Sequence, residues 1–231
     1  MLTLYIGNKN YSSWSMRPWV LLTQFGIPFR EIALRFDDMA ADSPFKQAVA
    51  RLSPAGRVPV LLHGDLAVWD SLAIAEYLAE YAAEHFPELA LWPRDAAARA
   101  RARSVSAEMH SGFGALRNAC PMNIEADLAE VGPRLLAEQP GLAADLARLT
   151  ALWTDALAAS GGPFLFGGFS IADAFYAPVV SRLRTYGLPV PAGLRAYMAR
   201  VWASPGVAAW VEGALAEQDF VPIDEPYRSH R

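Results

Sequence analysis

Cysteine is nearly absent from this sequence, whose 231 residues contain only Cys120. An internal disulfide and a cysteine-rich zinc site are therefore excluded. Charged residues are also sparse, at 19% of the chain, and the 24 acidic residues outnumber the 20 basic ones. The formal net charge of -4 argues against a general nucleic-acid binder, which would need a basic field.

Long apolar runs are missing as well. No segment approaches the roughly 20 consecutive apolar residues that cross a bilayer. The first residues, 1–7, lack the basic start and the apolar stretch of a signal peptide. Hydrophobic residues nevertheless make up 53% of the chain, which excludes a disordered protein. The composition predicts a cytoplasmic globular protein without a membrane partner, built as one large domain or two small ones.

The first 84 residues combine strand and helix patterns. Apolar and polar residues alternate over 2–6 and again over 32–36, which predicts two strands. Between them, apolar residues recur on one helix face, at Pro18, Leu21, Leu22 and Phe25. Two strands separated by a helix are expected to pair in parallel. The runs 58–62 and 66–69 flank a Gly-Asp turn and predict a hairpin, and Ser71 opens a further helix.

The composition changes near residue 85. Pro87 and Pro93 indicate a linker over 85–95, and no convincing alternating strand follows it. Helical patterns recur over 142–157, 170–186 and 194–217. The sequence therefore predicts an α/β domain over residues 1–84, the linker over 85–95, an all-helical domain over 96–220 and a tail over 221–231.

Four short segments, taken in order and spacing, resemble those of a known family. They are residues 11–18 (YSSWSMRP), 56–61 (GRVPVL), 70–71 (DS) and 170–173 (SIAD). Over nearly its whole length the chain resembles the glutathione S-transferase family. The resemblance implies a thioredoxin-like N-terminal domain followed by an all-helical bundle. It also implies glutathione as co-substrate, no metal, a homodimer and a role in detoxification.

The loop after the first strand carries three serines but no cysteine, so a thiol would have to come from a ligand. A hydroxyl donor and the positive end of a helix both favour a thiolate and lower its pKa. By the resemblance, Ser12 matches the serine that donates to the thiolate in zeta-class members, and Ser13 matches the one in delta-type members. Which of the two makes the bond here stays open. Ser15 is expected in the glutathione site. The alternative for any one of them is a turn or capping residue.

The other segments imply further contacts with glutathione. Pro59 should be cis, which would expose the backbone of Val58 for pairing with the cysteinyl part of the ligand. Asp70 and Ser71 open a helix, where free N–H groups suit a carboxylate, and they would hold the γ-glutamyl end. Arg57 would meet the glycine carboxylate. The alternatives are a trans peptide at Pro59, a simple helix cap at Asp70 and Ser71, and a solvated surface position for Arg57.

The last candidate feature is the pocket for the electrophile. Met109, Phe113 and Arg117 step by four, so they are expected on one helix face as an apolar floor with one cation. Trp14 would border this pocket. It stands where beta-class members have a cysteine, which argues against a mixed disulfide with glutathione. The alternative is a core between the domains. The segment Ser170 to Asp173 is a capping box and is expected to be structural.

We therefore expect a serine-type glutathione transferase that activates the thiol of glutathione for attack on an apolar electrophile. Its partners would be glutathione, a small electrophile and a second copy of the chain. One alternative is a glutathione-dependent isomerase of the maleylacetoacetate type, although Trp14 and the Asp70 position depart from that pattern. Another is a non-catalytic interaction protein on the same fold.

Overall fold

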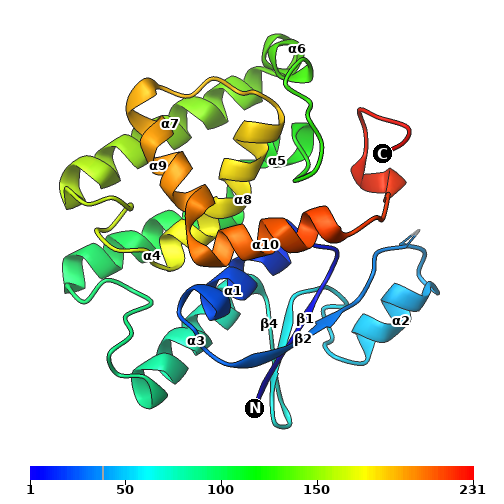
Figure 1. Cartoon of the computed structure of the whole chain (residues 1–231), viewed down its shortest axis with the longest axis vertical. Coiled ribbons are helices and arrows are strands. Elements are labelled where there is room, and N and C mark those ends of the chain that lie inside the picture. The colour runs from blue at the N-terminus through cyan, green and yellow to red at the C-terminus, as the bar shows by residue number, and fades with distance from the viewer. Residues whose placement is uncertain (38) are drawn as a thin grey trace.

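The computed structural model describes residues 1–37 and 39–231 (Figure 1). The elements, in chain order, are β1 (Leu2–Ile6), α1 (Ser13–Gln24), β2 (Phe29–Ala33), α2 (Pro44–Ala50), β3 (Val60–His63), β4 (Leu66–Trp69), α3 (Ser71–His85), α4 (Ala96–Ser111), α5 (Gly114–Ala119), α6 (Val131–Glu138), α7 (Pro140–Ser160), α8 (Ile171–Thr185), α9 (Ala192–Ala203), α10 (Pro205–Ala216) and a short 3-10 turn, η1 (Pro222–Asp224).

The four strands form one sheet in the order β2-β1-β3-β4. Strands β1 and β2 are parallel, and β3 pairs antiparallel with both β1 and β4, so the predicted parallel pair and hairpin are confirmed. Strand β2 begins earlier and ends earlier than the 32–36 prediction. Beyond it the chain leaves the sheet, because the Asn8 side chain accepts the Phe36 N–H at 2.7 Å in place of a ladder partner.

The two faces of the sheet are covered separately. Inward side chains such as Leu4 and Leu61 pack in the main core with α1 and α3, whereas Val60 faces a smaller cluster with Phe45 and Val49 of α2. The strand alternation places neighbouring residues on opposite faces. Figure 1 shows α2 and α3 on opposite sides of the sheet, with α1 and the later helices gathered above it.

Helix α8 is the centre of the helical half and is buried on nearly all sides. It packs against α1, α4 and α9, so it joins the helical half to the first helix of the chain. The predicted capping box at its start is present: the Asp173 carboxylate accepts the Ser170 N–H at 2.9 Å. Asp173 also accepts the Leu165 N–H and the Tyr197 hydroxyl, each at 3.1 Å, and so ties α8 to α9.

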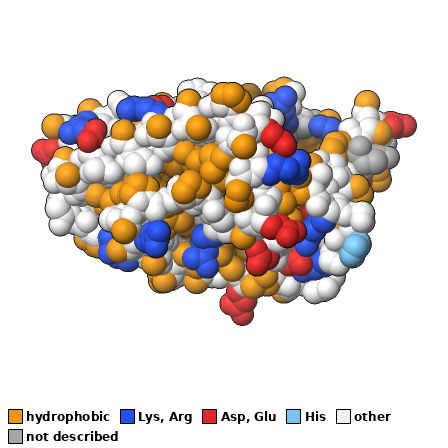
Figure 2. Space-filling view, turned by 90° about the horizontal axis from the view of Figure 1, so that it is seen from above, with side chains coloured by type: hydrophobic (Ala, Val, Ile, Leu, Met, Phe, Trp, Pro, Cys, Tyr) orange, Lys and Arg blue, Asp and Glu red, His pale blue; other side chains and the backbone are white. Residues whose placement is uncertain are grey.

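The outer face of the helical half is chemically mixed. Figure 2 shows apolar side chains towards its middle and Lys and Arg, often with Asp or Glu beside them, along its margins. Within the described residues, no helix combines the length and the apolar character needed to cross a bilayer.

Candidate active site

A cavity of about 450 Å³ opens where the loop between β1 and α1 meets α5, α8 and η1. A second hollow of about 320 Å³ lies beside it, over the start of α3. Trp14, Arg57 and Val58 line both, so the two form one groove along the end of the sheet.

The three loop serines occupy different positions. Ser12 and Ser13 line the larger cavity, whereas Ser15 is fully buried and its Oγ accepts the Gly7 N–H at 3.1 Å. The Ser12 Oγ lies 2.8 Å from the Ser15 Oγ, so Ser15 supports Ser12 from below. The Ser13 Oγ accepts a hydrogen bond from the Arg182 guanidinium at 3.2 Å. The hydroxyl hydrogen of Ser13 is therefore free to donate into the cavity.

Helix α1 begins at this cavity wall. Its N-cap, Ser12, makes no side-chain capping bond, and the backbone N–H groups of Trp14 and Ser15 have no acceptor among the described residues. Unpaired N–H groups and the positive end of a helix attract an anion. The start of α1 therefore adds positive potential beside the Ser13 hydroxyl.

The second hollow is built around two backbone features. The Val58–Pro59 peptide is cis, as expected, and the Val58 backbone has no hydrogen-bond partner among the described residues. Asp70, the N-cap of α3, has a φ of 74°, which is rare outside glycine and often marks a functional site. Its carboxylate caps the Leu72 N–H at 2.8 Å and faces the ring nitrogen Nε2 of His110 at 3.2 Å.

Two buried arginines join these features, and sequence reasoning missed both. Arg17 lies between the rings of Trp14 and Phe175, at 4.3 and 4.7 Å from their centres, and donates to the Ser71 Oγ at 3.1 Å. Arg182 donates to Ser13 from α8. Burial lowers the pKa of Arg17 to about 9 and that of Arg182 to about 10. The sequence feature that could have indicated them is an arginine within a helix whose pattern of residues predicts burial.

Family models match along most of the chain. The N-terminal domain model of glutathione S-transferases matches residues 11–81, and the C-terminal domain model matches residues 79–213. The chain belongs to the glutathione S-transferase family. The predicted fold class, a thioredoxin-like domain with an all-helical bundle, is thereby confirmed.

Several solved glutathione S-transferases share this fold. A glutathione transferase homologue from Burkholderia gl BGR1, solved with glutathione bound, is 27% identical with a TM-score of 0.69. The match covers 92% of this chain and 97% of that one. A theta-class enzyme from Xanthomonas axonopodis pv. citri, also with glutathione bound, is 26% identical with a TM-score of 0.64, over 93% of this chain and 99% of that one.

Curated relatives match over a shorter length. Glutathione S-transferase 1 of Dianthus caryophyllus is 32% identical over 53% of this chain and 51% of its own length. A probable maleylacetoacetate isomerase of Caenorhabditis elegans is 29% identical over 50% of this chain and 49% of its own length. The chain thus spans about half the length of the curated relatives it matches.

The transferase fold separates the residues expected in the electrophile pocket. Trp14 and Arg117 line the larger cavity, but Met109 is fully buried and Phe113 is nearly so, and neither lines it. The expectation of one helix face was wrong. Helix α4 ends at Ser111, and Phe113 has a φ of 55°, so the chain turns before α5 begins. A step of four residues does not reveal such a break.

The remaining predicted ligand-contacting residues all border the groove. Arg57 and Val58 line both hollows, and Pro59, Asp70 and Ser71 line the smaller one. Within the ranges that the structure describes, no group of three His, Cys, Asp or Glu side chains could hold a metal ion.

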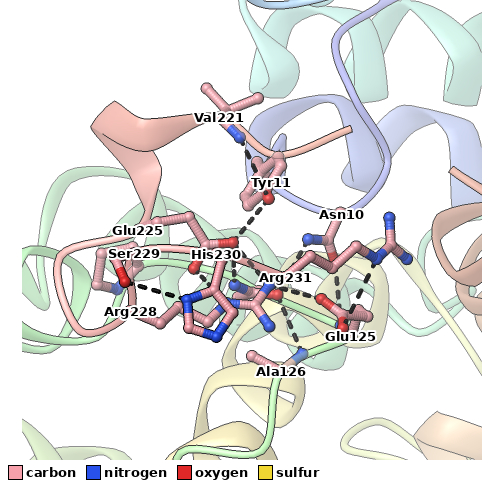
Figure 3. Close-up of polar contacts among 12 residues, drawn as sticks. Asn10, Tyr11, Glu125, Ala126, Val221, Glu225, Arg228, Ser229, His230 and Arg231 are labelled. Atoms are coloured by element: carbon pink, nitrogen blue, oxygen red, sulfur yellow. Dashed lines mark hydrogen bonds and ion pairs between the residues drawn. The ribbon is translucent and has the colours of Figure 1, made fainter. Parts of the chain in front are cut away.

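The chain beyond α10 contributes Asp224 to the lining of the larger cavity and is held in place by charged side chains (Figure 3). Glu225 is almost fully buried; its carboxylate accepts the Tyr11 hydroxyl at 2.7 Å and the Asn123 amide at 2.9 Å. Arg228 pairs with both Glu225, at 2.7 Å, and Glu125, at 2.5 Å. Burial and the contact with Glu225 raise the pKa of Tyr11 to about 12, so the phenol stays protonated.

We expect Arg228→Met to destabilise this family member by about 2–4 kcal/mol, since it leaves the buried Glu225 carboxylate without its cation. Urea unfolding measures the change. The matched control is Arg134→Met, whose partner Glu138 lies 3.6 Å away in an exposed pair, and which should cost under about 0.5 kcal/mol. Equal losses in the two variants would contradict a structural role for the Arg228 pair.

Proposed function

We propose that this protein is a cytoplasmic glutathione transferase that binds glutathione along the groove and activates its thiol as a thiolate. The Burkholderia and Xanthomonas relatives were solved with glutathione bound, which supports the choice of ligand. The observation that carries the proposal is that the Ser13 hydroxyl, the unpaired N–H groups of α1 and the free Val58 backbone all border one groove.

The groove provides a partner for each part of glutathione. The free N–H and C=O groups of Val58 would pair with the cysteinyl backbone as a short added strand. Ser71 at the start of α3 would bind the γ-glutamyl carboxylate, and Asp70 its ammonium group. Arg57, with Lys46 on the same cavity wall, would bind the glycine carboxylate.

The chemistry would be stabilisation of the thiolate followed by attack. We assign the principal donor role to Ser13, because its only side-chain partner among the described residues is the Arg182 cation, which polarises the hydroxyl and leaves its hydrogen free. The positive end of α1 favours the same charged sulfur. Loss of the thiol proton to solvent leaves a nucleophile held next to the electrophile, and this proximity supplies much of the rate.

Titration of bound glutathione tests this proposal. Thiolate absorbance is followed against pH with and without the protein. We expect a bound-thiol pKa well below the free value of about 8.5. Binding with an unshifted pKa would contradict thiolate activation. Absence of binding would contradict the whole proposal and favour the non-catalytic interaction protein.

A second candidate function is a glutathione-dependent cis–trans isomerase. The match to the probable maleylacetoacetate isomerase of Caenorhabditis elegans favours it. Both functions need the thiolate, so the titration does not separate them. Turnover of a cis-enone diacid without net consumption of glutathione would identify the isomerase, whereas a stable conjugate would identify the transferase.

We further propose that the protein forms a symmetric homodimer through the edge strand β4. Leu66 on this strand is 50% exposed, and an exposed apolar edge is a natural pairing surface. We expect Leu66→Glu to weaken the dimer at least tenfold in sedimentation equilibrium. Leu215→Glu, at 49% exposure on α10, is the matched control and should leave the association unchanged. A monomeric wild-type protein would rule the dimer out.

A further inference from the structure

Three arginines cluster behind and beside the serine loop. Arg17, Arg117 and Arg182 each affect the ionisation of another, and these mutual repulsions add to burial in lowering the pKa values of Arg17 and Arg182. Within the described part of the chain, none of the three lies within ion-pair distance of an Asp or Glu. The nearby Asp70 carboxylate, 3.2 Å from Nε2 of His110, partly offsets this repulsion for Arg17, whereas no carboxylate is a cause of the pKa shift of Arg182. Burying like charges together is costly unless an anion is bound among them.

The three arginines differ in how many of their N–H groups are free. Each nitrogen of the Arg182 guanidinium already donates, to the carbonyls of Cys120 and Pro178 and to Ser13. Arg117 uses one N–H, which donates to the His110 carbonyl at 3.1 Å. Its remaining donors have no acceptor among the described residues, and its guanidinium lies over the Trp14 ring, 5.3 Å from the centre.

The cavity wall as a whole is also positively charged. Its described lining includes four basic residues against one acidic residue, Asp224. Lys46 and Arg57 come from the sheet side of the cavity, where the proposed glutathione site places the glycine carboxylate. Arg117 and Asn118 come from α5, on the opposite wall. Glutathione on the sheet side therefore leaves the α5 wall with an uncompensated cation.

We propose that the electrophile carries an anionic group, a carboxylate in the simplest case, and that Arg117 binds it. The inference rests on the proposed glutathione transferase function and names the substrate class. The guanidinium forms two parallel hydrogen bonds with a carboxylate, a geometry that fixes both position and orientation. Trp14 supports the guanidinium and offers its ring to the apolar part of the same electrophile. We assign Arg117 to substrate specificity and not to the thiolate, because its hydrogen bond goes to the His110 carbonyl and not to a loop serine.

A matched pair of substrates tests the site: a chloronitrobenzoate and the chloronitrobenzamide with the same substitution pattern. In both, the glutathione sulfur forms a bond to the ring carbon that bears chlorine, and chloride leaves with the C–Cl electron pair. We expect the wild type to favour the acid at least tenfold in kcat/KM, after each value is divided by the uncatalysed rate. Arg117→Gln should lower kcat/KM for the acid about 10- to 100-fold and leave that for the amide within about threefold.

The control is Arg101→Gln, which removes the same charge from an exposed position on α4 and should change neither substrate. Equal losses on acid and amide in Arg117→Gln would overturn the anion site, because that pattern belongs to folding or thiolate stability. The absence of any preference in the wild type would overturn it as well.

Calorimetry separates this inference from the proposed function without requiring turnover. The probes are glutathione and two synthetic conjugates, one ending in the benzoate and one in the benzamide. Normal glutathione binding with equal affinities for the conjugates would overturn the anion site alone. Failure to bind glutathione would overturn both proposals. At least tenfold tighter binding of the benzoate conjugate, lost in Arg117→Gln, is the expected result.

Discussion

Replacing Ser13 by alanine should raise the pKa of the bound glutathione thiol towards its free value of about 8.5. The variant loses the hydroxyl that Arg182 polarises from behind at 3.2 Å. Removal of one preorganised donor to a developing or bound anion typically costs about 100- to 1000-fold in rate. We therefore expect kcat/KM at neutral pH to fall by about that factor, while the affinity for glutathione changes little, because Val58, Asp70 and Ser71 are untouched.

The companion variant Ser12→Ala provides the control for this assignment. Its hydroxyl is already engaged with the Ser15 Oγ at 2.8 Å, so we expect a loss of about tenfold or less. The titration is the deciding measurement because it reports the thiol pKa directly. A shifted pKa that survives in Ser13→Ala and disappears in Ser12→Ala would transfer the role to Ser12.

Replacing Asp173 by alanine should destabilise the protein by about 3–5 kcal/mol. The variant leaves the N–H groups of Leu165 and Ser170 and the hydroxyl of Tyr197 without their acceptor in a fully buried position. Each unsatisfied group costs about 1–3 kcal/mol. Urea unfolding measures the loss, and Asp155→Ala on the exposed side of α7 is the control. A loss no larger than that of the control would show that the capping box is dispensable.

The ionisation of Asp173 gives this interaction a pH dependence. Burial outweighs its hydrogen bonds and raises its pKa to about 6 from the ordinary 3.8. The folded state therefore holds this proton more tightly than the unfolded state. The part of the folding stability that comes from binding this proton is complete below pH 3.8 and is lost as the pH rises through about 6, whereas the hydrogen bonds that Asp173 accepts remain. In Asp173→Asn the group no longer titrates, so stability should fall less between these pH values than in the wild type.

Local sequence patterns predicted much of the fold. The alternation over Leu2–Ile6, the Gly-Asp turn before β4 and the capping box at Ser170 depend on nearest neighbours, and the structure contains all three. Strand β2 ends at Ala33, before the predicted residue 36, because a side chain distant in sequence, Asn8, accepts the Phe36 N–H. No periodicity within 29–36 records that interaction.

The sequence predicted the site residues that belong to short motifs, but not those that packing of distant segments brings together. The groove residues Val58 and Asp70 follow from short motifs. Arg17 and Arg182 lie 165 positions apart in the numbering yet affect each other's ionisation, since α1 packs on α8. Met109 and Phe113 failed as pocket residues because the turn between α4 and α5 redirects them into the core. Such outcomes depend on tertiary structure that a single-sequence pattern does not contain.

The contacts that hold the serine loop in place set an order on its folding. The Lys9 N–H is accepted by Glu217, which is 208 residues later, and the Tyr11 hydroxyl by Glu225, which is 214 residues later. Contacts across such separations form late, since a long loop must close before they are gained. During synthesis the sheet strands emerge and can pair long before these two acceptors exist. The loop that bears the proposed nucleophile-activating serine therefore reaches its final support only after residues 217–225 have left the ribosome.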